Sequence, residues 1–280
     1  MLAEKRLIRI DVLIPSSFSY ESHHPIEKIV RIGYIARCLA ASRVDTLIIY
    51  HEELDSPQRE NAEYIKLVMD YLNTAPYLRK KIYPLTSRLK YAGVLPPLNI
   101  PTHPEREDLN VEHYREGLVI SSNKKSIIYA GLKKMLKTDK KFKKGARVIV
   151  RIMPFQDKMR FKVYSKKKAK IYSGFRTAVV SQRLDEIVKD YDVKIATSRL
   201  GVDIRSIWRE LEEKIKNADR ICIAFGSAKR GLREIAELHK IDYEKTFDYI
   251  INTFPNQAVR TIRTEEAIAY TLSILNLITS

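Results

Sequence analysis

The chain has 280 residues, of which 45% are hydrophobic, and it carries a formal net charge of +17. A chain of this length buries a substantial core and has room for two domains. No apolar run approaches the roughly 18 residues of a membrane span, and the first residues lead directly into a strand-like pattern, so we expect a cytoplasmic protein with no membrane partner.

The first part of the chain alternates strand and helix patterns. Residues 8–14 and 46–50 have the composition of buried strands, and residues 25–41 between them have the period of a helix. Ser56 and Pro57 suit the cap and the first position of a second helix. This alternation predicts a parallel sheet of the α/β class.

A proline-dense segment at residues 95–108 ends this alternation, because proline fits neither a helix interior nor a central strand. Short β patterns follow up to about residue 171, with only a weak helical patch at residues 132–136. Their spacing predicts a small five-stranded barrel or a similar all-β module. We therefore divide the chain into an α/β part at residues 1–92, an inserted β domain at 93–172 and a second α/β part at 173–280.

The positive charge is concentrated in the predicted β domain. Residues 121–172 contain 18 Lys or Arg and two acidic residues, whereas the rest of the chain contains 33 basic and 32 acidic residues. A basic surface with interleaved aromatic rings suits nucleic acid, and single-stranded or loop RNA in particular. A disordered tract is disfavoured because β patterns run through the segment. The aromatic residues are Tyr129, Phe142, Phe155, Phe161, Tyr164 and Tyr172.

The α/β alternation resumes after residue 175 and contains three polar turns. Strand patterns that end near residues 197, 225 and 252 lead into TSRLG, FGSAKRGL and NTFPNQAVRTIRTEEA. Because the carboxyl ends of parallel strands meet at one edge of a sheet, these turns are expected to frame a small-molecule pocket. The last turn is the richest in polar side chains, with Asn252, Asn256, Gln257, Arg260, Thr261 and Arg263.

The last helix is expected to begin at the cap residue Thr264 and to reach about residue 279. Its apolar residues occupy more than one face, so a symmetric partner would provide cover, and we expect a homodimer. A helix buried wholly inside its own subunit is the alternative. The residues that need cover are Ile268, Leu272, Leu275 and Ile278.

Several common sites lack support in the sequence. No GxGxxG follows the first strand, and the P-loop spacing of Gly226 and Gly231 is followed by Leu232 and Arg233 instead of Lys and Ser or Thr. The histidines have no metal-ligand spacing, and the two cysteines are expected in the core, so we predict no metal site.

The three turns together resemble the SPOUT superfamily of knotted RNA methyltransferases. The similarity is greatest to the archaeal and eukaryotic branch, which carries an OB-like domain inserted into the knot domain. The resemblance extends to IPSSFSYE at residues 14–21, APYLRKKIYPL at 75–85 and YAGVLPPLNIPTHP at 91–104, so it covers essentially the whole chain. It implies a C-terminal trefoil knot whose loops bind S-adenosylmethionine at a dimer interface.

The resemblance also implies roles for individual residues. Arg260, Arg263, Glu265 and Glu266 would bind substrate phosphate or the methionine moiety or form structural pairs. Arg260 and Arg263 are the catalytic candidates, because either could orient the acceptor. No general base is identified. The first cofactor loop would contain Thr197, Ser198 and Gly201, the second Phe225 and Gly226, and the third Ile251, Asn252, Phe254, Gln257 and Thr261.

We therefore expect an S-adenosylmethionine-dependent methyltransferase that acts on RNA, with ribosomal RNA the favoured substrate and a base nitrogen favoured over the ribose 2′-hydroxyl. Catalysis would rest mainly on positioning and electrostatics. The alternative is a non-catalytic RNA-binding or ribosome-assembly protein that retains the knot fold. Methyl transfer distinguishes the two.

Overall fold

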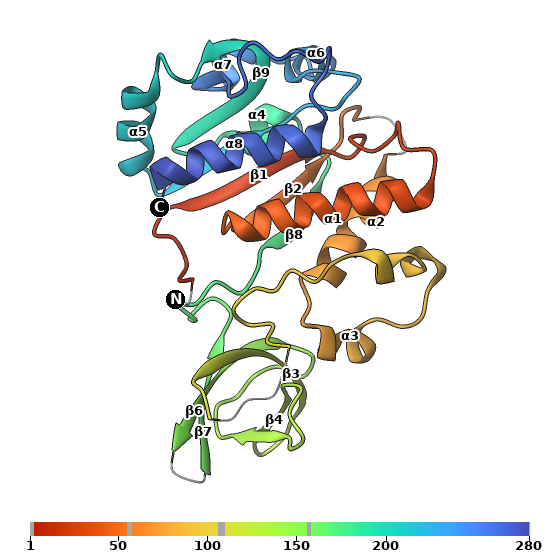
Figure 1. Ribbon diagram of the computed structural model, residues 1–280, viewed down its shortest axis with the longest axis vertical. Helices are drawn as coiled ribbons and strands as arrows, with labels where there is room; N and C mark the ends of the chain where they lie inside the picture. The colour runs from red at the N-terminus through yellow and green to blue at the C-terminus, as the bar shows by residue number, and fades with distance from the viewer. Residues whose placement is uncertain (1–2, 55–57, 106–109, 156–157, 280) are drawn as a thin grey trace. The chain divides into compact units, whose positions relative to one another are not determined.

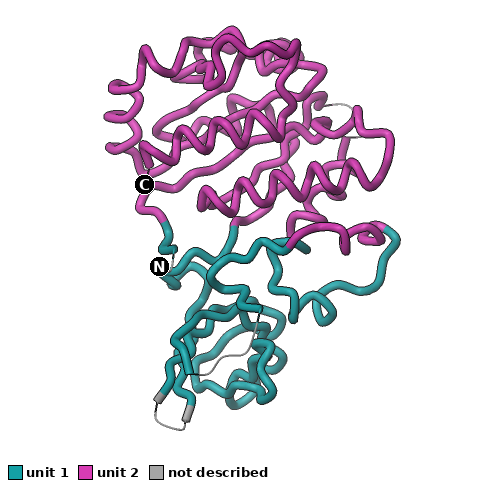
Figure 2. Tube along the Cα trace, viewed as in Figure 1, with its two compact units in different colours: residues 1–5, 71–87, 97–174 teal, residues 6–70, 88–96, 175–280 magenta. Residues whose placement is uncertain are grey.

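The computed structural model describes residues 3–54, 58–105, 110–155 and 158–279. The chain forms two compact units, shown in Figure 2. Unit 1 comprises residues 1–5, 71–87 and 97–174, and unit 2 comprises residues 6–70, 88–96 and 175–280. Unit 1 therefore includes residues 71–87, which precede the predicted boundary at residue 92.

Unit 2 is built on a six-stranded sheet in which every neighbouring pair is parallel, which confirms the predicted sheet type. Its central strands are apolar and buried along almost their whole length, as expected for strands covered on both faces. In sheet order the strands are β11 (Tyr249–Asn252), β9 (Val193–Asp203), β10 (Arg220–Ala224), β1 (Arg9–Pro15), β2 (Thr46–Tyr50) and β8 (Arg176–Val180).

Helix α1 (Pro25–Ala41) has the predicted bounds, and its start has a local cause. The His24 ring nitrogen accepts a hydrogen bond from the Ile26 amide at 3.2 Å, and Pro25 occupies the first helical position. Helix α8 (Thr264–Thr279) lies beside α1 (Figure 1). The remaining helices of the chain are α2 (Arg59–Leu72), α3 (Pro76–Ile82), α4 (Leu184–Val188), α5 (Trp208–Lys216), α6 (Leu232–Leu238) and α7 (Tyr243–Thr246), with short 3-10 turns at Ser87–Leu89 and Ala92–Val94.

Several local predictions differ from the structure. The weak helical patch at residues 132–136 is not a helix, and strand β5 (Leu136–Thr138) begins there instead. Helix α7 was missed because its four residues are too short for a helical period. The predicted cap at Ser56 and Pro57 lies outside the described residues.

Helix α8 also corrects the expectation that a partner subunit covers its apolar residues. Its residues Ile268, Leu272, Leu275 and Ile278 are buried within the chain itself. The helix packs against α1 and α5, so these four side chains do not require a partner subunit. A partner surface on α8 would have to use other residues.

Unit 1 contains a five-stranded antiparallel, barrel-like sheet, in agreement with the predicted all-β module. Its core includes Val119, Ile128, Val148 and Val150. A Cβ atom at Gly117 would lie 2.6 Å from a methyl carbon of Ile128, so glycine is required where β3 passes under this core. In sheet order the strands are β5, β4 (Ser126–Tyr129), β3 (His113–Ser122), β6 (Arg147–Phe155) and β7 (Lys158–Ser165).

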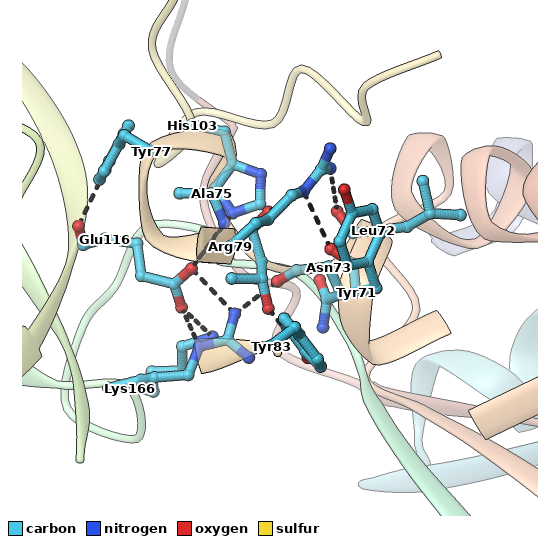
Figure 3. Close-up of polar contacts among 12 residues, drawn as sticks. Tyr71, Leu72, Asn73, Ala75, Tyr77, Arg79, Tyr83, His103, Glu116 and Lys166 are labelled. Atoms are coloured by element: carbon cyan, nitrogen blue, oxygen red, sulfur yellow. Dashed lines mark hydrogen bonds and ion pairs between the residues drawn. The ribbon is translucent and has the colours of Figure 1, made fainter. Parts of the chain in front are cut away.

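A buried ion-pair cluster centred on Glu116 of β3 stabilises unit 1 (Figure 3). Its Oε1 atom lies 2.6 Å from both Arg147 Nε and Lys166 Nζ, and its Oε2 atom lies 2.8 Å from Arg147 Nη2. The Ala75 amide donates to Oε2 at 3.1 Å, and His103 Nε2 lies 3.5 Å from the same oxygen. Burial opposes ionisation, but Lys166, His103 and Arg147 together hold the pKa of Glu116 well below its usual value.

Candidate functional site

A cavity of about 490 Å³ lies at the carboxyl ends of β9, β10 and β11, and all three predicted turns contribute to its wall. Its volume falls in the range of small-molecule sites. The wall also includes Arg260, whereas Gly201 and Arg263 are not among the described residues that line it. The predicted cofactor residues in the wall are Thr197, Ser198, Phe225, Gly226, Ile251, Asn252, Phe254, Gln257 and Thr261.

The first wall segment is an interruption in the ladder between β9 and β11. TSRLG was expected to be a turn after the strand, but it lies within the bounds of β9. Ile250 pairs with Ala196 and Ile251 pairs with Val202, so residues 197–201 are left out of the ladder. A Cβ atom on Gly201 would lie 2.6 Å from the Ile251 carbonyl carbon. Gly201 therefore shapes the wall by admitting the backbone of β11, although it does not line the cavity.

The second segment, residues 225–231, is fixed by bonds to its backbone. The Tyr50 hydroxyl donates to the Phe225 carbonyl at 2.7 Å, and the Thr264 hydroxyl donates to the Gly226 carbonyl at 3.0 Å. A Cβ atom on Gly226 would lie 2.8 Å from the Arg230 carbonyl oxygen, so this tight turn requires glycine. The turn then leads into α6.

The third segment follows β11 and is held by the side chain of Asn252. Its Oδ1 atom accepts from the Phe254 amide at 2.9 Å, and its Nδ2 atom donates to the Arg199 carbonyl at 2.8 Å. Asn252 therefore clamps the first and third segments together. The Phe254 ring stacks on Tyr270 with centroids 4.7 Å apart, yet 42% of Phe254 remains exposed. This leaves an aromatic surface at the cavity for a flat ligand ring.

The charged residues after this segment have separate structural partners. Arg31 of α1 forms a buried two-bond ion pair with Glu265, at 2.7 and 2.9 Å, so the structural role left open for Glu265 is the one observed. Glu266 accepts from the Arg263 amide at 2.8 Å. The carbonyl oxygen of Arg260 accepts from Arg199 Nη1 at 2.9 Å, which fixes the backbone at Arg260.

One carboxylate beside the cavity was missed in the sequence. Glu52 follows β2, and its Oε1 atom accepts a hydrogen bond at 2.8 Å from the hydroxyl of Ser227, a residue of the cavity wall. Arg230 bonds the neighbouring Glu53 and lies 3.7 Å from Glu52. No sequence motif joins residues 175 positions apart, so only the strand order could have indicated this pair.

The basic segment of unit 1 presents mainly lysines, and fewer accessible rings than expected. Tyr172 is buried, and Phe142 and Phe161 pack against the core of the sheet, so these three rings are less accessible than the interleaved pattern suggested. The side chain of Phe155 lies outside the described part. The ammonium groups of Lys81 and Lys140 lie over the rings of Tyr129 and Tyr164, at 4.7 and 5.5 Å.

Among the residues that the structure describes, no group of three or more His, Cys, Asp or Glu side chains could hold a metal ion. Within the same residues, every helix is too short or too polar to cross a bilayer.

Known proteins resemble the chain along almost its whole length. A family model described as "Putative RNA methyltransferase" matches residues 9–275. Uncharacterized proteins of Haloarcula marismortui and Halobacterium salinarum are each 30% identical to the chain, over 95% of it and 98% of their own length. The human 28S rRNA (uridine-N(3))-methyltransferase is 30% identical over 95% of the chain and 77% of its own length.

Proposed function

The chain belongs to this RNA methyltransferase family, and we propose that it transfers a methyl group from S-adenosylmethionine to a base nitrogen of ribosomal RNA. The observation that carries the proposal is the cavity at which three strand-end segments meet. The name of the human relative specifies N3 of uridine, and we propose a uridine imide nitrogen as the acceptor here.

The chemistry of the cavity fits S-adenosylmethionine. Thr197 and Ser198 contribute hydroxyl groups to the wall, and Phe254 with Tyr270 offers a stacked aromatic surface suited to an adenine ring. When bound, S-adenosylmethionine supplies an electrophilic methyl group on a sulfonium sulfur. Arg260 lies in the same wall, where its guanidinium can orient an anionic or carbonyl-rich acceptor.

We also propose that the chain belongs to the SPOUT superfamily, with unit 2 as its knotted domain and unit 1 as its inserted OB-like domain. The five antiparallel strands of unit 1 and the three cavity segments of unit 2 support this assignment. The concentration of lysine in residues 121–172 supports unit 1 as the main RNA-binding surface, with most of the affinity coming from phosphate contacts.

The chain is proposed to act as a homodimer. Ile26, Val30 and Tyr34 are exposed at four-residue intervals on one face of α1. Tyr270 and Leu277 are exposed on the adjacent α8, where 73% of Leu277 is accessible. These five residues form an apolar face that a second copy of the chain would cover.

Two measurements test the proposed function. Isothermal titration calorimetry with S-adenosylhomocysteine should show binding without added metal, and radiolabelled methyl groups should pass from S-adenosylmethionine into ribosomal RNA. Mass mapping of RNA from a deletion strain and its parent would then locate the nucleotide. RNA binding without methyl transfer would support the non-catalytic alternative.

A further inference from the structure

The carboxyl edge of unit 2 contains a second polar region next to the cavity. The chain leaves β1 through α1 to reach β2 on one side, whereas β10 and β9 lie on the other side of β1. Such a reversal in strand order opens a crevice at the carboxyl ends of the strands, where open α/β sheets bind ligands. Segments after β1, β2 and β10 therefore meet at the position expected for a ligand.

Glu52 is fixed at this edge in a manner that keeps its carboxylate directed at Ser227. Only 4% of Glu52 is exposed. Its amide donates to Gln58 Oε1 at 2.8 Å, and the Ser16 hydroxyl donates to the same oxygen at 2.9 Å. The Ser227 hydroxyl completes the arrangement by donating to Glu52 Oε1 at 2.8 Å. A buried carboxylate thus reaches the cavity wall through one hydroxyl group.

The same edge contains buried polar atoms that have no hydrogen-bond partner among the residues that the structure describes. They are the hydroxyl oxygens of Ser17 and Ser19 after β1, the Nε2 atom of His51 after β2 and the Oδ1 atom of Asn61 in α2. Buried polar atoms are nearly always hydrogen-bonded, so a group of unpaired ones suggests a ligand that bonds to them. Burial lowers the pKa of His51, and the positive charge of Arg59 lowers it further. The ring is therefore neutral near pH 7 and can donate or accept a hydrogen bond.

Other acidic or phenolic groups near the cavity are less suited to accept a proton. Glu234 accepts from the Gly231 amide at 2.8 Å as part of the start of α6, and Glu266 is bonded to the Arg263 amide. Burial raises the pKa of the Tyr243 phenol to about 12, so it is protonated near neutral pH. Of these described carboxylates, Glu52 bonds a side-chain hydroxyl of the wall, whereas Glu234 and Glu266 bond backbone amides.

We propose that the acceptor base binds between this edge and the cavity, and that its nitrogen-bound proton passes to Glu52 through the Ser227 hydroxyl. This inference rests on the proposed function. An imide nitrogen is a poor nucleophile until it loses its proton. In the step, the nitrogen–hydrogen bond breaks and its proton moves to the Ser227 oxygen, while the proton of Ser227 moves to Glu52. The electron pair left on nitrogen forms the bond to the methyl carbon, and the pair of the carbon–sulfur bond stays on sulfur.

In this scheme Ser227 contacts the base, and Glu52 positions Ser227 and stores the proton. The charged and titratable groups that face the Glu52 carboxylate are Arg230, Tyr20 and Tyr50. Of these, Arg230 is the cation, and it is bonded to Glu53.

The test compares Glu52→Gln and Ser227→Ala with the control Glu53→Gln, an adjacent carboxylate that bonds Arg230 but not Ser227. Loss of general-base catalysis should lower the turnover number of Glu52→Gln about 10²- to 10⁴-fold. Calorimetry should show unchanged affinity for S-adenosylhomocysteine. The remaining activity of Glu52→Gln should increase with pH more steeply than that of the wild type, because the base must then lose its proton to solvent. Glu53→Gln should retain wild-type turnover.

Two results for Glu52→Gln would overturn the inference while leaving the proposed function intact. The first is wild-type turnover. The second is a parallel loss of turnover and of S-adenosylhomocysteine binding, which would indicate a structural role for Glu52. If Glu52→Gln fails to fold, Ser227→Ala decides, and full activity in that variant would refute the relay. Absence of RNA methylation by the wild type would instead refute the proposed function.

Discussion

Replacing Glu116 with glutamine would show how far unit 1 depends on its buried carboxylate. Glu116 is fully buried and bonded to two cations and a backbone amide. Glutamine keeps the shape and one acceptor oxygen, but its NH2 group is a hydrogen-bond donor and would face the donor groups of Arg147 and Lys166. Removing one partner of a buried ion pair typically costs about 3–5 kcal/mol. Arg147 and Lys166 are partly exposed and regain some hydration, so we expect a loss near the lower end of that range.

The appropriate assay is urea unfolding monitored by hydrogen exchange, since amide protons in each unit report the unfolding of that unit separately. With an m value of about 1–3 kcal/mol/M, the midpoint for the β3–β7 amides should fall by about 1 M or more. Trp208, the only tryptophan, lies in α5 of unit 2 and reports that unit by fluorescence. Glu112→Gln is the matched control, because Glu112 pairs with Arg151 in the same unit but is 42% exposed. Such a surface pair contributes about 1 kcal/mol or less.

The pKa of Glu116 adds a dependence on pH. Because the folded pKa is held below the unfolded value, ionised Glu116 stabilises the fold fully above the unfolded pKa of about 4.3. This stabilisation is lost as the pH falls through the folded pKa. The difference between the wild type and Glu116→Gln should therefore be constant at neutral pH and shrink below about pH 4. Equal unfolding midpoints at pH 7 would refute the reasoning.

Three further predictions concern the cavity, the subunit interface and RNA. Gly201→Ala should cost about 1–3 kcal/mol of stability and weaken S-adenosylhomocysteine binding, because its Cβ would collide with the β11 backbone. Gly93→Ala is the control, since Gly93 has open space around it, and its melting temperature should be nearly unchanged. Leu277→Asp should convert the proposed dimer into folded monomers by light scattering, and a monomeric wild type at micromolar concentration would contradict the interface. Neutralising four exposed lysines should weaken RNA binding and reduce its salt dependence by about 0.7 in logarithmic slope for each lost phosphate contact, with an unchanged slope contradicting their role. The four are Lys133, Lys134, Lys143 and Lys144.

The sequence predicted elements well where the local composition is distinctive. Helix α1 and strand β2 have their predicted bounds, because Pro25 suits the first position of a helix and an apolar run marks the strand. The grouping of three turns was also predictable, because parallel strands place their carboxyl ends at one edge. The path of TSRLG was not, because the close approach that Gly201 permits depends on β11, nearly fifty residues later.

The side-chain pairs that hold the site in place could not be predicted from the sequence for a related reason. In the sequence, Arg31 is one charged residue in an amphipathic helix, where the usual position is on the solvent face. In the structure it is buried and pairs with Glu265, 234 positions away. Periodicity indicates which face of an element is apolar, but it does not identify the element packed against a charged side chain.

Strand order supplies the missing information. Because β1 lies between β10 and β2, the segment after β2 meets the turn after β10, although most of unit 1 and several strands separate them in the chain. A donor-rich turn such as FGSAKRGL can therefore be recognised from its own composition, whereas Glu52 acquires its significance only from Ser227. A proton acceptor for a reaction at this edge is thus expected on a strand remote in sequence from the cofactor loops, which is why inspection of those loops alone identifies no base.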